Sequence, residues 1–208
     1  MRASGSAGFG GDHSLVHGNE LHMRMNMSNT QNYTDVVTGL PGADHWTGSE
    51  HAGLVLLEYG DYECPTCGAA EPFTLHLLDT FASRMKFVFR HFPLVEVHPH
   101  AELAAEAAEA AAAQGKFWEM HHLLFTHGQH LKPADLAHYA EQLELDMPRF
   151  NAEMADRIYL QRVQEHRRTG EKIGLHASPS FFLNGTLVDV SFGLEHLENA
   201  VRAALGKQ

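Results

Sequence analysis

Two apolar runs in the first half of the chain, residues 54–57 and 85–92, have the length of buried strands. The first is a continuous aliphatic run and the second mixes alternation with aromatic and β-branched residues, so both predict strands. Between them, apolar residues recur at helical spacing and predict a helix that ends at about Ser83. Pro72 is expected to kink this helix, and residues 44–51 are expected to be a polar lead-in to the first strand.

Residues 98–173 are almost entirely helical in pattern. Helices are predicted over 101–113, 116–127, 134–143 and 153–172, with a short turn opened by Pro148. We expect Glu102, Glu106 and Glu109 to lie on one solvated face of the first of these helices.

The last stretch of the chain returns to strands. Residues 180–183 and 186–190 predict two strands joined by the turn Asn184–Gly185, which favours a hairpin, and a helix is predicted over 195–205. The order strand, helix, strand near the start predicts a parallel pair with a right-handed crossover. Together these elements predict an α/β protein, a thioredoxin-like fold with an inserted all-helical domain.

This fold divides the chain into a tail, two halves of a core and an insertion. The expected boundaries are 1–43 for a disordered tail, 44–97 for the first half of the core, 98–173 for the inserted helical domain and 174–208 for the second half of the core. The tail shows no helical or strand period. Its alternating Met23, Met25 and Met27 are either part of this disorder or soft ligands for copper(I).

Composition and charge narrow the possible partners and compartments. The 208 residues are 44% hydrophobic and 20% charged, which is enough apolar material for a real core. The net charge of −11 argues against nucleic acid or an anionic membrane surface, and no apolar run approaches the length of a membrane span. No apolar stretch typical of a signal peptide follows Arg2, so a cytoplasmic location is expected, with the periplasm as the alternative if the N-terminus is altered.

Candidate chemistry lies between the first strand and the first helix, where Cys64 and Cys67 are separated by two residues. They are the only cysteines in the chain. Pro65 suits the first helical position, so Cys64 is expected at a helix N-terminus, where unpaired N–H groups favour a thiolate. Cys67 follows one turn later on the same side, close enough for a disulfide. The spacing therefore predicts a redox dithiol.

Other interpretations of this pair stay open. The pair can be half of a zinc site, although no second cysteine pair exists to complete four ligands. It can also be a chance pair in a buried helix. The alternative function is thus a non-catalytic metal-binding (zinc or copper) or metallochaperone module that uses Cys64, Cys67 and nearby histidines. A third interpretation is a thioredoxin-fold partner-binding domain with a vestigial site.

Several of the 17 histidines are candidates for such roles. Glu119 and His122 have the Glu-x-x-His spacing of carboxylate-bridged iron sites, but no second copy exists, so His122 is expected to be a surface histidine on a helix. His91, His98 and His100 lie near the end of the second strand. They can reach the active-site cleft or remain partly exposed loop histidines.

Three segments carry a resemblance to a known family: residues 58–67, the strand end at 90–94 with 98–100, and residues 178–185. Over about residues 44–205 the chain resembles the DsbA-like thiol-disulfide oxidoreductases of the thioredoxin superfamily. The resemblance implies an enzyme that exchanges disulfides with protein or peptide thiols, together with a redox partner protein. It implies no bound cofactor, because the dithiol is itself the redox group, and a monomer is expected.

The resemblance also implies roles for single residues. Cys64 matches the family's exposed nucleophile and Cys67 its resolving thiol. Pro179 matches the proline that is cis in this superfamily and lies against the dithiol. The backbone of Ser178, just before this proline, is expected to pair with the substrate chain.

The remaining expected site residues surround the first cysteine. Glu58 matches the buried acid that relays protons to the resolving cysteine, the alternative being a strand-end glutamate that faces solvent. Pro65 and Thr66 are expected to contact the substrate. Strongly oxidising members of the family carry His in place of Thr66. Because Thr66 cannot supply a cation, and Asp61 and Glu63 place negative charge nearby, a more reducing couple is expected.

Overall fold

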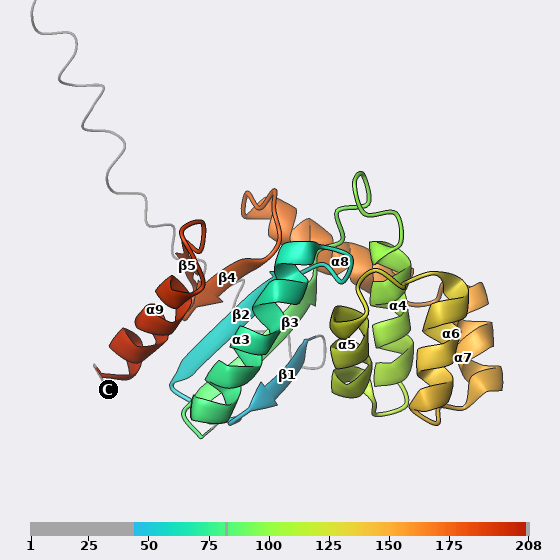
Figure 1. Cartoon of the computed structure of the whole chain (residues 1–208), viewed down its shortest axis with the longest axis horizontal. Helices are drawn as coiled ribbons and strands as arrows, with labels where there is room; N and C mark the ends of the chain where they lie inside the picture. Colours follow the sequence, from blue (N-terminus) through green and yellow to red (C-terminus); the bar gives the residue numbers. More distant parts are fainter. Residues whose placement is uncertain (1–43, 82, 207–208) are drawn as a thin grey trace, which may run out of the picture. The chain divides into compact units, whose positions relative to one another are not determined.

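The computed structural model describes residues 44–81 and 83–206 (Figure 1). The predicted tail, including its methionine alternation, lies outside the described residues. The strands are β1 (His45–Gly48), β2 (Leu54–Gly60), β3 (Met85–His91), β4 (Ser180–Leu183) and β5 (Thr186–Val188). The helices are α3 (Pro65–Phe81), α4 (Ala101–Ala112), α5 (Phe117–Thr126), α6 (Pro133–Gln142), α7 (Met147–Ala155), α8 (Leu160–Lys172) and α9 (Glu195–Leu205).

The five strands form one mixed sheet in the order β1-β3-β2-β4-β5. The central strand β2 runs parallel to β3 and antiparallel to β4, so the predicted parallel pair is confirmed. The predicted hairpin of β4 and β5 is also confirmed. Its turn residues Asn184 and Gly185 both have positive φ, 46° and 81°, as a tight hairpin turn with right-handed strand twist requires.

Strand β1 lies in the segment for which the sequence predicts only a polar lead-in. It pairs antiparallel with β3 at the edge of the sheet, with Trp46 opposite Val88. Its four residues alternate between half-buried and exposed, so it has no apolar run that would reveal it. The strand depends on β3 for its backbone hydrogen bonds.

The two faces of the sheet follow the two-residue period of the strands. Leu54 and Leu56 of β2 pack on the side that carries α3 and α9, whereas Leu57 and Tyr59 pack with Leu175 on the other side. Figure 1 shows α3 lying across β2 and β3. Glu58 has the same parity as Leu54 and Leu56. The alternation therefore points its carboxyl group toward the α3 side of the sheet.

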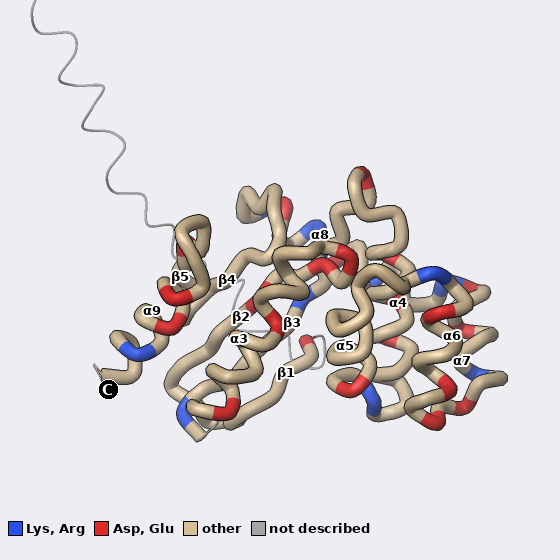
Figure 2. Tube along the Cα trace, in the orientation of Figure 1, with Lys and Arg blue, Asp and Glu red and all other residues tan. Residues whose placement is uncertain are grey.

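Five helices, α4 to α8, lie between β3 and β4 in the chain. Figure 1 shows α4, α5, α6 and α7 gathered beside the sheet, and α8 contacts both β3 and α4. In Figure 2, acidic and basic positions are mixed along α7 and α8. All described residues belong to one compact unit, so the division into a core and an inserted domain stays a prediction from chain order.

The predicted helix over 153–172 is wrong, because the chain breaks at residues 156–159 between α7 and α8. Arg157 adopts a positive φ of 51° in this break, and its guanidinium pairs with Glu106 and Glu102 of α4. Pro148 does not open a short turn but lies in the first turn of the nine-residue helix α7. These tertiary ion pairs give no periodic signal in the sequence.

The solvated acidic face predicted for α4 is also wrong. Glu106 and Glu109 are each only 1% exposed, and Glu102 is half-buried. The Glu109 carboxylate accepts hydrogen bonds from His91 Nε2 at 2.9 Å and His45 Nε2 at 3.0 Å. The Glu109 carboxylate is therefore hydrogen-bonded to imidazoles from β1 and β3, where the helical pattern alone predicts contact with solvent.

Candidate active site

The dithiol lies where the chain passes from β2 to α3. After β2 ends at Gly60, the Cys64 N–H donates to the Asp61 carbonyl at 3.2 Å, and the Cys64 carbonyl accepts from Gly68 N–H at 3.1 Å. Cys64 thus immediately precedes α3, whose first residue is Pro65, as the sequence predicts. Both cysteines are in the reduced form, with Cys64 8% exposed and Cys67 fully buried.

Hydrogen-bonding groups surround the Cys64 sulfur. The Thr66 hydroxyl lies 3.0 Å from it and the Ser178 carbonyl oxygen 3.5 Å from it. Hydrogen bonds from the Cys67 thiol and from Thr66 lower the pKa of Cys64 to about 4, although partial burial opposes this shift. At neutral pH Cys64 is therefore a thiolate, which is the reactive form of cysteine.

Cys67 has the opposite properties. Its side chain is fully buried, and burial raises the pKa of the Cys67 thiol well above its ordinary value. The backbone N–H of Asp61 donates to its sulfur at 3.5 Å, which only partly offsets the burial. The two thiols are thus differentiated, with an anion at Cys64 and a neutral thiol at Cys67.

A loop from the far end of the chain covers this pair. The Ser178–Pro179 peptide bond is cis, as the resemblance to the DsbA-like family implies. The Ser178 carbonyl oxygen accepts from the Cys64 thiol when that thiol is protonated. The Thr66 hydroxyl, 3.3 Å from this oxygen, donates its one proton either to it or to the Cys64 thiolate. The expected site residue Ser178 therefore lies against Cys64 and Thr66, 112 to 114 positions away from them in the chain, and Pro179 directly follows it.

Glu58 of β2 is buried, with only 1% of its surface exposed, so the alternative of a surface glutamate is wrong. Its register partners on β3 and β4 are Phe89 and Phe181. Burial, followed by the negative charges of Glu71 and Cys64, raises the pKa of Glu58 well above the ordinary value. A Cβ atom at Gly60 would lie 2.5 Å from the Phe89 ring, so this strand end has no room for a larger residue.

Two carboxylate–imidazole pairs hold the active-site turn. His98 Nδ1 donates to the Asp61 carboxylate at 2.8 Å, and His100 Nδ1 donates to Glu63 at 2.8 Å. Asp61 and Glu63, which the sequence marks only as negative charges near the dithiol, thus each have an imidazole partner. The sequence contains the signal for this in His98-Pro99-His100, which lies just after the second strand.

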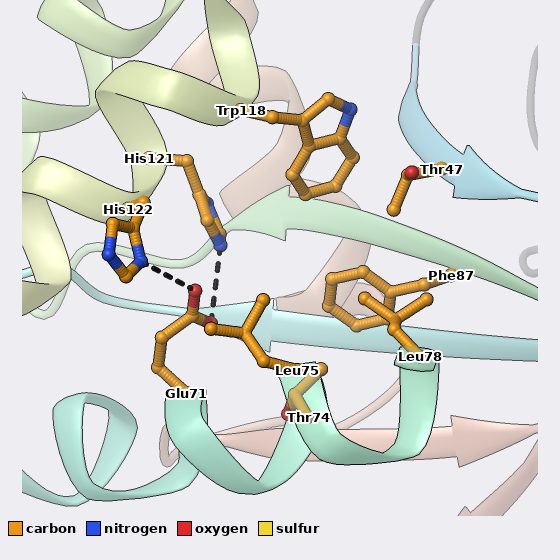
Figure 3. Close-up of a pocket in the computed structure, with 9 residues that line it drawn as sticks. All are labelled: Thr47, Glu71, Thr74, Leu75, Leu78, Phe87, Trp118, His121 and His122. Atoms are coloured by element: carbon orange, nitrogen blue, oxygen red, sulfur yellow. Dashed lines mark ion pairs between the residues drawn. The ribbon is translucent and has the colours of Figure 1, made fainter. Parts of the chain in front are cut away.

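A cavity of about 190 Å³ lies between α3 and α5, lined on one side by Glu71 (Figure 3). Glu71 follows Cys67 by one helical turn and faces His121 Nε2 at 3.5 Å and His122 Nδ1 at 3.8 Å. His122 is exposed, but His121 is only 2% exposed and shares a hydrogen bond with the Tyr62 hydroxyl at 3.0 Å. The predicted surface histidine on this helix is therefore confirmed for His122, whereas its neighbour His121 is part of the interior.

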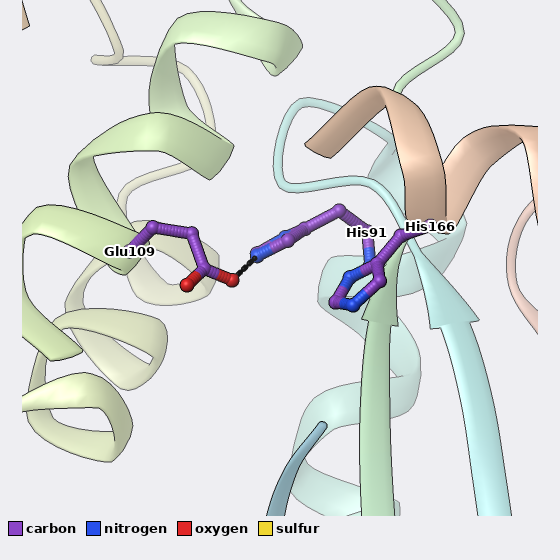
Figure 4. A group of neighbouring side chains, drawn as sticks. All are labelled: His91, Glu109 and His166. Atoms are coloured by element: carbon purple, nitrogen blue, oxygen red, sulfur yellow. Dashed lines mark hydrogen bonds and ion pairs between the residues drawn. The ribbon is translucent and has the colours of Figure 1, made fainter. Parts of the chain in front are cut away.

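The alternative of a metal-binding module needs several ligand side chains close together. Within residues 44–81 and 83–206, one group of three potential metal ligands lies within 4.8 Å: His91, Glu109 and His166 (Figure 4). Neither cysteine belongs to it. Glu109 is already engaged by the imidazole of His91 and by Arg162 Nε at 3.2 Å. This group is a polar cluster that joins α4 and α8 to β3.

A family model described as thioredoxin matches residues 41–203 of the chain. The chain belongs to the thioredoxin family. The predicted fold class is thereby confirmed, and so is the resemblance to DsbA-like proteins, because solved structures of that kind share the fold.

Two such structures cover most of this thioredoxin family member. Oxidised BdbD from Bacillus subtilis has 20% sequence identity and a TM-score of 0.70, covering 79% of this chain and 94% of its own. The thiol-disulfide exchange protein alpha-DsbA2 from Wolbachia pipientis has 21% identity and a TM-score of 0.71, covering 83% and 91%. At these identities the likeness establishes the fold.

A relative with higher sequence identity is named as an antiporter and not as an oxidoreductase. The Na(+)/H(+) antiporter NhaA 1 of Salinispora arenicola (strain CNS-205) is 46% identical over 164 residues, which are 79% of this chain and 25% of that protein. The chain thus spans about a quarter of the length of the curated relatives it matches. Among the described helices, none is long and apolar enough to cross a membrane.

Proposed function

We propose that this thioredoxin family member is a thiol-disulfide oxidoreductase that exchanges disulfides with protein or peptide thiols through Cys64 and Cys67. The observation that carries the proposal is the contrast between the two thiols. Cys64 has a pKa of about 4 and lies against the Ser178 carbonyl, whereas the pKa of the buried Cys67 is raised. Such a pair presents one nucleophile to the substrate and holds the second thiol in reserve.

In the oxidising direction, a substrate thiolate attacks the Cys64 sulfur of the Cys64–Cys67 disulfide. The S–S bond breaks, a mixed disulfide forms at Cys64, and Cys67 leaves with the electron pair. A second substrate thiolate then attacks the substrate sulfur of the mixed disulfide. This step releases the oxidised substrate and leaves Cys64 as a thiolate, and the reverse sequence reduces a substrate disulfide.

Glu58 is proposed to handle the proton of Cys67. A buried thiolate at Cys67 is unfavourable, so the leaving sulfur needs a proton as it departs. The raised pKa of Glu58 keeps a proton on its carboxyl group, on this side of the sheet. A negative charge on Glu58 would disfavour a second negative charge on Cys67, so one proton between the two groups is favoured. Pro65, Thr66 and the backbone of Ser178 are proposed to contact the substrate chain.

The dithiol is the redox group of this proposal, and no bound cofactor takes part. Thiol-disulfide exchange as the reaction is supported by the structural likeness to alpha-DsbA2, which is a thiol-disulfide exchange protein, and protein or peptide thiols are the proposed substrates. A redox partner protein, a monomeric state and a cytoplasmic location stay predictions. The proposal does not include antiport, because this chain matches only a quarter of the length of the relatives that are named as antiporters.

The test uses a model peptide that carries two cysteines. Oxidised protein is expected to convert the reduced peptide to its disulfide. Reduced Cys67→Ser, mixed with the peptide disulfide, is expected to accumulate a mixed disulfide at Cys64, mapped by mass spectrometry. Cys64→Ser is the matched control and is expected to form no adduct. Adducts at Cys67 in the wild type, or loss of peptide oxidation only when metal is removed, would contradict the proposal and favour the metal-binding alternative.

A further inference from the structure

The loop between β3 and α4 folds back over the active-site turn. Its Leu94 N–H donates to Asp61 Oδ2 at 2.9 Å, and His98 Nδ1 donates to the same oxygen at 2.8 Å. Further along the loop, the backbone N–H of His100 donates to Glu63 at 2.6 Å. The loop is therefore fixed to both acidic residues that precede the nucleophile, and His98 has a defined place.

Asp61 connects this histidine to both thiols. Its carbonyl accepts from the Cys64 N–H at 3.2 Å and its own N–H donates to the Cys67 sulfur at 3.5 Å. Asp61 is only 1% exposed. A buried anion in this position opposes a second negative charge on Cys64 unless a cation balances it.

His98 is placed to be that cation. Partial burial opposes a charge on the imidazole, but the hydrogen bond to Asp61 and the charges of Asp61, Cys64 and Glu63 outweigh burial and raise the pKa of His98. The side chain of His98 is 18% exposed, compared with 36% for His100, so solvent screens the charge of His98 less. The other charged group of the loop, Glu96, is occupied by Arg167 of α8 at 2.8 Å.

We propose that His98 is a positioning residue that acts through Asp61, balancing its charge and supplying beside the Cys64 thiolate the positive charge that Thr66 cannot. The proposal rests on the proposed function of the dithiol and adds a pH-dependent control of its redox poise. A chain segment outside the dithiol motif thereby determines how strongly the disulfide oxidises other thiols.

The control follows from linkage between two charges. Reduction of the disulfide takes up two electrons and one proton when Cys64 remains a thiolate and Cys67 becomes a thiol. The thiolate exists only in the reduced form, so it attracts the proton of His98 only in that form. By thermodynamic reciprocity, the free energy by which protonated His98 stabilises the thiolate equals the free energy by which the thiolate stabilises protonated His98. As pH rises and His98 loses its proton, the couple loses this stabilisation and becomes more reducing.

The first test is a histidine NMR titration of oxidised and reduced protein, with the His98 signal assigned by its absence in His98→Gln. Glutamine is the chosen replacement because its amide can still donate to Asp61 without carrying a charge. We expect the pKa of His98 to be higher in the reduced protein than in the oxidised protein. Equal values in the two forms would overturn the proposal.

The second test equilibrates wild type and His98→Gln with glutathione, which supplies or accepts the two electrons as a thiol or a disulfide. At about pH 6 we expect His98→Gln to weaken oxidation of glutathione by about three- to tenfold, the effect of half to one pKa unit at Cys64. This fold-change corresponds to about 15–30 mV for a two-electron couple. At about pH 9, where wild-type His98 is expected to be neutral, the two proteins are expected to agree.

His100→Gln is the matched control, because it loosens the same loop at the neighbouring acid. We expect it to leave the pH dependence in place. A His98→Gln effect of equal size at both pH values would show a purely structural role and would overturn the proposal. Failure of the proposed function is distinguishable, because the NMR linkage concerns the dithiol alone and does not require turnover of a protein substrate.

Discussion

The Thr66 hydroxyl oxygen lies 3.0 Å from the Cys64 sulfur. When Cys64 is a thiolate, this hydroxyl donates a hydrogen bond to it, although Thr66 carries no charge. One neutral donor in the right place thus does part of what a cationic imidazole does between the cysteines of strongly oxidising relatives. The pKa of about 4 at Cys64 stabilises the reduced form and so acts toward an oxidising couple, while the more reducing couple expected from the sequence stays a prediction.

Thr66→Val tests this hydrogen bond. A hydrogen bond to a charged group contributes about 1.5–3 kcal/mol, so its loss is expected to raise the pKa of Cys64 by about one to two units. Thiolate absorbance at different pH values measures the shift. Thr66→Ser keeps the hydroxyl and is expected to stay near the wild type, and a Ser variant that shifts as far as the Val variant would argue against the hydroxyl.

Glu58→Gln tests the proton transfer at Cys67. The fold is expected to remain intact, because glutamine has the same shape, but departure of Cys67 from the disulfide loses its proton source. We expect mixed-disulfide formation to slow by about 10²-fold or more, the lower range for general acid catalysis. Stopped-flow measurement across pH checks this, and unchanged rates would remove Glu58 from the mechanism.

The same substitution has a separate effect on stability. The pKa of Glu58 is raised in the folded protein, so ionisation of Glu58 is less favourable there than in the unfolded chain. The resulting loss of folding stability is absent below the pKa of the unfolded chain and complete above the pKa of the folded protein. Glu58→Gln removes the cost. We expect a gain of about 1–3 kcal/mol at neutral to alkaline pH and little change at acidic pH. Urea denaturation at both pH values gives the comparison.

Glu109 is expected to be one of the most sensitive positions for stability. Its buried carboxylate is the shared partner of His91, His45 and Arg162. Glu109→Ala leaves these groups uncompensated, and breaking such a buried pair costs about 3–5 kcal/mol. Glu102→Ala, on the same helix but half-buried, is expected to cost less than about 1 kcal/mol. Similar losses for both variants would show that burial of the ion pair is unimportant.

Buried histidines predict an acid-sensitive fold. Burial lowers the pKa of His91 and His121, and burial with the neighbouring charge of His91 lowers that of His166 to about 3. The unfolded chain therefore binds more protons below about pH 6.5, and stability falls as pH drops from there toward 3. We expect His166→Asn to reduce the slope of the unfolding free energy between about pH 6 and 4. An unchanged slope would contradict the buried, neutral state of His166.

The parts of the fold that could be predicted are those with a local signal. The segments 54–60, 65–81 and 195–205 show apolar periodicity and are bounded by glycine, proline or charged residues. The hairpin turn at 184–185 needs two residues that tolerate positive φ, and Asn-Gly supplies them. Cys64 and Cys67 could likewise be assigned from their spacing and their place before a helix.

The parts that could not be predicted depend on partners far away in the chain. Glu109 looks solvated on its own helix, and only the fold brings His45 and His91 to it. The charge of Asp61 looks unfavourable to the thiolate in the sequence, because only the fold brings His98, 37 positions later, into hydrogen-bond contact with it. Hydrophobic periodicity indicates the secondary structure of a single segment, whereas these polar contacts join separate helices, strands and loops.

The order of elements along the chain has a consequence for biosynthesis. The sulfur of Cys64 and the carbonyl of Ser178 touch across 114 positions, because α4 to α8 are synthesised between β3 and β4. Contacts of such long separation close slowly and late in folding. A nascent chain therefore carries its CxxC pair on the ribosome well before the loop that shields it exists. During translation the two thiols are open to whatever oxidant or chaperone reaches them first.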